Sequence, residues 1–201
     1  MSLVSRLTIF GNGVEPTLRQ WHCRWLARAL CGFVVLAIAS TPSIAVEDPP
    51  PLDMQAKLLL KVIPFINWPA PIARERSVTV CVTGDNPFGA LLDGVAALQP
   101  PGSPKVTIRP LTEKESPVEC QILYVGGKPT AASAEVLAAA EGHPILTITD
   151  SMPLAAPRGI INFVPASDRA PLEIDVGGAE RNHLDISSKL LSIAAGVRPP
   201  E

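Results

Sequence analysis

SVTVCVTGDNPFGALLDGVAAL, residues 77–98, contains a strand, a turn and a helix in direct succession. Polar and apolar residues alternate over 77–84, and the segment is rich in valine and threonine, which is typical of a β-strand. Asn86 is placed to cap a helix and Pro87 to occupy its first turn, so a helix is predicted over 87–98. A strand followed by a helix is the repeating unit of parallel α/β sheets.

The same unit recurs along the chain. Strands are predicted at 105–111, 120–127 and 143–150, and an alanine-rich helix is predicted over 130–140. These repeats predict an α/β fold with a mostly parallel central sheet, flanked by helices on both faces. In a flavodoxin-like strand order the first strand, 77–84, lies beside the third.

Both ends of the domain depart from this repeat. A helix is predicted to begin at Asp53, as its N-cap, and to end or kink at Pro64. At the other end, strands at 159–165 and 171–177 predict a C-terminal antiparallel β-hairpin. An amphipathic pattern over 184–197 predicts a closing helix.

The first residues of the chain have the pattern of an export signal. Arg24 and Arg28 precede an uncharged apolar run, and the segment ends on Ser-Ile-Ala, which suits signal peptidase. The run is too short to cross a hydrocarbon layer of roughly 30 Å. We expect a cleaved signal peptide at 1–45, a proline-rich leader at 46–52 and a single domain at 53–197. The protein is then periplasmic without direct membrane insertion; a retained single-helix anchor is the alternative.

The charge of the exported part argues against nucleic acid as a partner. Residues 1–45 hold four of the 17 basic residues and one of the 19 acidic residues. The rest of the chain therefore has 13 basic and 18 acidic residues, a formal net charge of −5. Binding to phosphate groups needs clustered lysine and arginine, and so does docking on an anionic membrane surface.

Cys81 and Cys120 are the cysteines that remain after cleavage. In an oxidising compartment an even pair predicts one disulfide. The flavodoxin-like order agrees with this, because it places the two cysteines on neighbouring strands. Two buried free thiols are the alternative, since unpaired cysteine is among the most buried residue types.

The sequence gives little support to catalysis. The turn at 84–89 has neither a G-x-G-x-x-G pattern nor a phosphate-binding lysine, and the glycines at 126–127 are typical of a loop turn. No H-x-x-x-H or C-x-x-C spacing occurs after residue 45. Glu173 and Asp175 share one face of a predicted strand, and we expect that face to be the solvated side of the hairpin. We therefore expect a protein that is not an enzyme and that uses no cofactor and no metal.

KVIPFINWP, residues 61–69, holds two aromatic side chains in a chain with only 4% aromatic residues. Phe65 is expected in the core, where it pins the first helix to the sheet. Trp68 lies just before a proline stop and is expected at the rim of the sheet, partly exposed, because tryptophan is enriched in interface hot spots. Phe65 and Trp68 are thus candidates for binding a protein partner.

Three stretches together resemble a known family. They are the segment 57–69 ending in INWP, VCVTGDNPFGALLD at 80–93, and GIINFVP…LEIDV…HLDISSKLLSIA at 159–194. Their order and spacing are similar to those of the YfiR family of small periplasmic proteins. The resemblance covers about residues 53–197 of this chain.

The resemblance implies a periplasmic protein that binds the periplasmic sensor region of a membrane-bound diguanylate cyclase and holds the enzyme inactive. Cyclic-di-GMP then falls and biofilm formation is restrained. It also implies a homodimer and a response to redox state. Cys81 and Cys120 match cysteines of the family, but the loop 151–158 lacks the second pair found in some members, which puts a redox switch built on that pair in doubt.

Two other functions stay open from the residues themselves. One is a periplasmic small-molecule-binding module that uses the crevice at the C-terminal ends of the parallel strands, near 84–89 and 126–130. The other is a hydrolase with a site assembled from Asp85, His143 and Ser187.

Overall fold

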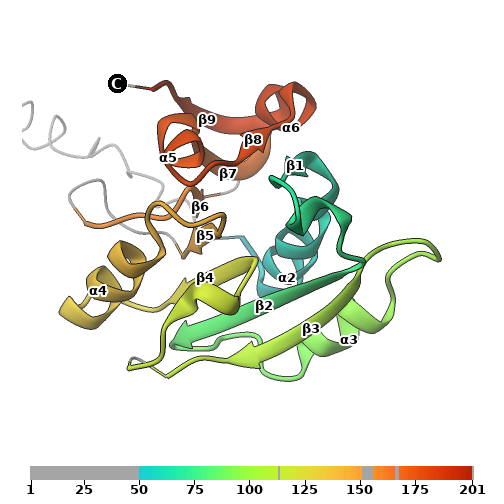
Figure 1. The fold of residues 1–201 in the computed structure, drawn as a ribbon, viewed down its shortest axis with the longest axis horizontal. Coiled ribbons are helices and arrows are strands. Elements are labelled where there is room, and N and C mark those ends of the chain that lie inside the picture. Colours follow the sequence, from blue (N-terminus) through green and yellow to red (C-terminus); the bar gives the residue numbers. More distant parts are fainter. Residues whose placement is uncertain (1–49, 113, 151–155, 166–167, 201) are drawn as a thin grey trace, which may run out of the picture. The chain divides into compact units, whose positions relative to one another are not determined.

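The computed structural model describes residues 50–112, 114–150, 156–165 and 168–200 (Figure 1). The predicted signal peptide at 1–45 lies outside these residues. The elements, in chain order, are α2 (Leu52–Lys61), η2 (Ile63–Phe65), β1 (Ile66–Asn67), η3 (Ile72–Arg74), β2 (Ser77–Gly84), α3 (Leu91–Ala97), β3 (Lys105–Pro110), η4 (Pro117–Glu119), β4 (Ile122–Gly126), α4 (Ala131–Ala140), β5 (Leu146–Thr149), β6 (Ile161–Phe163), β7 (Ala170–Asp175), α5 (Val176–Arg181), β8 (Asp185–Ile186), α6 (Ser188–Ile193) and β9 (Ala194–Arg198).

The main sheet has seven strands in the order β3-β2-β4-β5-β6-β7-β9. The pairs β3–β2, β2–β4, β4–β5, β5–β6 and β7–β9 are parallel. Within this sheet only β6 and β7 pair antiparallel, and they form the predicted C-terminal hairpin. The mostly parallel sheet is confirmed, and so is the flavodoxin-like placement of the first predicted strand, β2, beside the third, β4.

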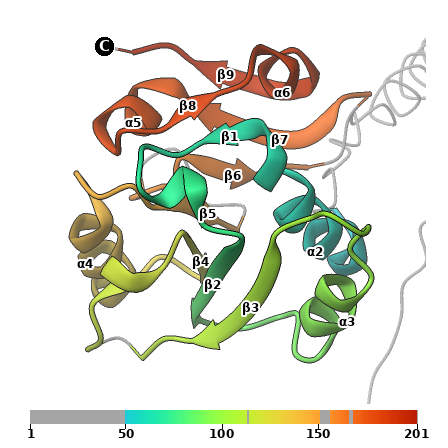
Figure 2. The same cartoon turned by 45° about the vertical axis from the view of Figure 1, so that its right-hand side comes forward.

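Alternate residues of the central strands enter two separate cores, as the period of two in a strand requires. Val80 and Val82 of β2 face a large core that also holds Leu59 of α2 and Leu92 of α3. Cys81, between them, faces a smaller core that α4 covers. Figures 1 and 2 show α2 and α3 on one side of β2 and β4, with α4 on the other. The sheet is therefore covered on both faces.

The helix starts differ from the predictions. Pro51, and not Asp53, is the N-cap of α2, because proline suits the start of a helix and needs no N–H partner there. The helix predicted over 87–98 begins only at Leu91. The Asn86 side chain accepts a hydrogen bond from the N–H of Phe88 (3.0 Å) and so stabilises a turn before the helix. Burial of Phe88 holds that turn against the sheet.

The closing helix is shorter than predicted. Of the predicted span 184–197, only Ser188–Ile193 is helical, with Ser187 as its N-cap. Ala194–Arg198 instead forms β9, which pairs parallel with β7 at the edge of the sheet. Asp185–Ile186, before the helix, forms the small strand β8, which pairs antiparallel with β1. This two-stranded sheet of β1 and β8 was absent from the predictions.

Candidate functional site

The segment 61–69 connects α2 to the first strand of the main sheet. Helix α2 ends at Lys61, and Pro64 lies in the 3-10 turn η2 that follows, so the predicted early end of the helix is confirmed. Trp68 is half-buried, as predicted, but Phe65 is also half-buried and is not a core residue. The 3-10 turn and β1 bring Ile66 inward, 5% exposed, and this leaves Phe65 at the rim of the large core.

The C-terminal part of the chain fixes this segment in place. The carbonyl oxygen of Phe65 accepts a hydrogen bond from the N–H of Ser187 (2.9 Å). The ammonium group of Lys189 lies 5.8 Å from the centre of the Phe65 ring, within the range of a cation–π contact. The side chain of Asn67 donates a hydrogen bond to Asp185 (2.9 Å). Phe65 is therefore held from both sides while part of its ring stays accessible.

A disulfide joins Cys81 of β2 to Cys120, the residue that follows η4. Their Cα atoms lie 5.8 Å apart, within the usual range for a bridge. Both cysteines are buried in the small core, together with Val136 and Ala140 of α4. The structure thus agrees with the disulfide hypothesis and not with two free thiols.

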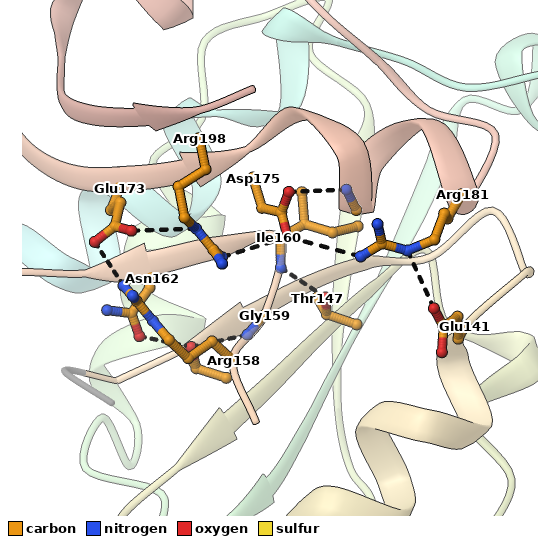
Figure 3. A network of polar contacts seen from close by, with 12 residues as sticks. Glu141, Thr147, Arg158, Gly159, Ile160, Asn162, Glu173, Asp175, Arg181 and Arg198 are labelled. Carbon is orange, nitrogen blue, oxygen red and sulfur yellow. Dashed lines mark hydrogen bonds and ion pairs between the residues drawn. The ribbon is translucent and has the colours of Figure 1, made fainter. Parts of the chain in front are cut away.

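Six charged residues form an arginine–carboxylate network around β7 and β9, the last strands of the main sheet (Figure 3). Its members are Glu141, Arg158, Glu173, Asp175, Arg181 and Arg198. Glu173 and Asp175 share a face of β7, as predicted, but the prediction of a solvated face was wrong. Their side chains are only 20% and 19% exposed, because arginines from other segments cover them.

Glu173 lies at the centre of the network, because two arginines contact its carboxylate. Arg158 donates to Glu173 at 2.6 Å, and Arg198 contacts the other oxygen of Glu173 at 3.2 Å. Arg198 also bridges to Asp175 at 3.3 Å, so this one arginine links both carboxylates of β7 (Figure 3). Arg181 lies 3.8 Å from Asp175 and donates to Glu141 at 3.1 Å. The network thereby joins α4, the segment before β6, β7, α5 and β9.

Hydrogen bonds of the backbone just before β6 hold Arg158 next to Glu173. The hydroxyl of Thr149 accepts a hydrogen bond from the N–H of Gly159 (3.1 Å), and that of Thr147 accepts one from Ile160 (2.9 Å). The Arg158 side chain is 5% exposed, and its Nε and Nη1 have no hydrogen-bond partner among the described residues. A cation buried to this degree depends on its carboxylate, so the network is a structural support with little tolerance for loss of Glu173.

The crevice at the ends of β2 and β4 is small. It has a volume of about 240 Å³, below the range of roughly 300–1,000 Å³ usual for ligand pockets. The loop after β2 closes over the loop after β4. A Cβ atom added at Gly126 would lie 2.0 Å from the carbonyl oxygen of Asp85, and one at Gly127 would lie 2.6 Å from its carboxylate. A carboxylate at the mouth of the crevice also disfavours phosphate.

Asp85, His143 and Ser187 do not form a catalytic arrangement. Asp85 packs on the loop 126–127, and Ser187 caps α6 by accepting a hydrogen bond from Lys189. His143 follows the end of α4, where its carbonyl oxygen accepts from Ile145. Within the described ranges no hydrogen bond or ion pair joins the three side chains. They therefore give no support to a hydrolase.

The described residues contain no group of three histidine, cysteine or acidic side chains that could hold a metal ion. None of the helices in these ranges is both long enough and apolar enough to span a bilayer.

Comparison with known proteins identifies the family. No curated protein matches the chain as a relative. The sequence pattern that defines the YfiR/HmsC-like family matches residues 52–195, which is more than half of the chain and contains every helix and nearly every strand described above. The chain therefore belongs to the YfiR/HmsC-like family.

Proposed function

We infer that this protein is a periplasmic regulator that binds the periplasmic sensor region of an inner-membrane diguanylate cyclase and inhibits the enzyme. Membership in the YfiR/HmsC-like family carries this proposal, because it supports a regulatory role in diguanylate cyclase signalling and not a catalytic one. The signal-like segment 1–45 and the disulfide between Cys81 and Cys120 suit an exported protein.

The aromatic rim of Phe65 and Trp68 is proposed to contribute to partner binding. Both side chains are half-buried against the large core, so each offers part of its ring to a partner. The prolines at 64 and 69 and the pairing of β1 with β8 hold the segment in one conformation. A preorganised aromatic surface loses little conformational entropy on binding, which favours its use as an interface.

Gene deletion tests the proposed function. Loss of the protein should raise cellular cyclic-di-GMP and biofilm formation, and expression of the full-length chain from a plasmid should reverse both effects. A chain whose segment 1–45 is removed, and which therefore stays in the cytoplasm, is the matched control and should not reverse them. Unchanged cyclic-di-GMP after deletion, in a strain that normally expresses the protein, would refute the proposal.

A further inference from the structure

An apolar groove lies between α2 and α3. It has a volume of about 860 Å³ and is bounded by α2, η2, the end of α3 and the proline-rich loop 99–104. Its apolar lining includes Leu60, Ile63, Phe65, Val95, Leu98 and Val106. We call it the α2–α3 groove. It shares Phe65 with the aromatic rim, so the two surfaces are continuous.

The groove has an exposed apolar wall. Leu98, in its lining, is 84% exposed and is the most exposed large hydrophobic residue of the described chain. Phe65 and Val95 line the same groove and are half-buried. An apolar hollow with an exposed leucine at its edge is typical of an interaction site.

The charges of the groove restrict what it can hold. Lys57 and Lys61 are the charged residues of its lining, and none of the described lining residues is acidic. Lys57 pairs with Asp53 at 3.0 Å, whereas Lys61 is exposed and makes no ion pair with any described residue. The groove is therefore apolar with one free positive charge at its rim, in a protein whose formal net charge is −2. An apolar segment with a carboxylate is complementary to it.

Two other occupants fit these features less well. In a symmetric dimer the groove would meet a copy of itself, and because its described lining holds no acidic residue, Lys61 would find no carboxylate partner there. A small ligand normally needs several polar groups that converge on it, whereas the polar side chains of this lining are divided between α2 and the loop 99–104. A peptide segment that lays two or three apolar side chains along the groove needs no such convergence.

We propose that the α2–α3 groove binds an apolar, carboxylate-bearing segment of the periplasmic region of the diguanylate cyclase, with that carboxylate paired to Lys61. This inference rests on the proposed function and specifies the surface and the chemistry through which it operates. Phe65 contributes to the floor of the groove, and Leu98 contributes its exposed wall.

Site-specific photo-crosslinking in cells tests the position. The full-length chain carries a photoreactive phenylalanine analogue at Leu98 or, as the control, at Val118. Val118 is 52% exposed but belongs to η4, which contacts α4 on the other face of the sheet. Position 98 should crosslink to the periplasmic part of a membrane-bound diguanylate cyclase, in a peptide with apolar residues and an Asp or Glu. Position 118 should give no such product.

A charge reversal tests the chemistry. The probe is the purified periplasmic region of the cyclase identified by the crosslink. Lys61→Glu should weaken its binding about 10-fold, because an attractive rim charge becomes repulsive. The exposed Lys128, at the far crevice, supplies the control Lys128→Glu, which should bind within about twofold of the wild type. Circular dichroism should show both variants folded.

The possible failures separate the two proposals. If position 98 crosslinks only to a second copy of this chain, or Lys61→Glu binds like the wild type, the groove proposal is wrong while the proposed function stands. The same holds if Leu98→Asp is folded and still lowers cyclic-di-GMP fully. If deletion leaves cyclic-di-GMP unchanged and no cyclase is crosslinked, the proposed function itself fails, and the groove proposal fails with it.

Discussion

Glu173→Gln removes a negative charge that two arginines share. In the wild type the carboxylate contacts Arg158 at 2.6 Å and Arg198 at 3.2 Å, and the Arg158 side chain is only 5% exposed. Breaking a buried ion pair costs about 3–5 kcal/mol, because the remaining charge stays buried without compensation. Arg198 is 40% exposed and keeps Asp175 as a partner, so the lower end, about 3 kcal/mol, is expected. With an m value of about 2 kcal/mol/M, the urea midpoint falls by about 1.5 M.

The assay is urea denaturation followed by far-UV circular dichroism at pH 7, with the disulfide intact. Asp53→Asn is the matched control. It also neutralises a carboxylate paired with a cation at 3.0 Å, but its pair with Lys57 is exposed and screened by water, so the urea midpoint should hardly change. The double variant Arg158→Met/Glu173→Leu should be less destabilised than Glu173→Gln, because both buried charges are gone. If Glu173→Gln costs no more than Asp53→Asn, the reasoning about the network is wrong.

Three further predictions concern the disulfide, the single tyrosine and the aromatic rim. The double variant Cys81→Ala/Cys120→Ala should lose about 4 kcal/mol of unfolding free energy, because the disulfide no longer restricts a loop of 39 residues in the unfolded chain. A loss below about 1 kcal/mol in urea denaturation would contradict this prediction. Burial, and secondarily the charge of Asp150, raises the pKa of Tyr124 above its ordinary value of 10.0. The neutral phenol therefore stabilises the fold below pH 10, and this stabilisation is lost as the pH rises through the raised pKa of the folded state. Because the chain has one tyrosine, absorbance at 295 nm should show no tyrosinate in folded protein at pH 11, whereas guanidinium-unfolded protein should titrate near 10; a native titration near 10 would show that the ring is accessible. Trp68→Ala should weaken binding of the purified cyclase region more than it lowers the urea midpoint, and the opposite order would make Trp68 a core residue.

The order of the sheet could be predicted because the signal is local. Strands β2, β4 and β5 are short runs of β-branched and apolar residues, and β2 and β4 are each followed by a turn and a helix. The C-terminal end could not be predicted in the same way. Residues 194–198 contain two alanines and continue a helical pattern, yet they pair with the open edge of β7. Hydrogen bonding to a free strand edge, which a sequence pattern does not contain, outweighs the helix propensity of alanine.

The arginine–carboxylate network shows a similar limit. The alternation of 173 and 175 correctly predicted that both carboxylates share a face of one strand. Nothing in that pattern indicates that Arg158 and Arg198, which are 15 and 25 residues from Glu173, converge on the same face. Arg158 lies just before a predicted strand, but Arg198 follows a segment that was predicted as a helix and forms β9 instead.

Phe65 was misplaced for a local reason. Phe65 was expected to pin the first helix to the sheet, but the backbone around Pro64 forms a 3-10 turn followed by a strand. The inward position then passes to Ile66, and Phe65 becomes half-buried.

The sulfur atoms of Cys81 and Cys120 lie in the small core beneath α4, where the two cysteines are 0% and 2% exposed. A dissolved thiol can therefore reach the bond only while the small core around it is transiently open. The rate of reduction under conditions that keep the protein folded then measures how often this core opens, separately from global unfolding. Blocking the free thiols with an alkylating reagent at successive times after adding the reductant would give this rate. No label is needed, because the disulfide itself lies in the small core.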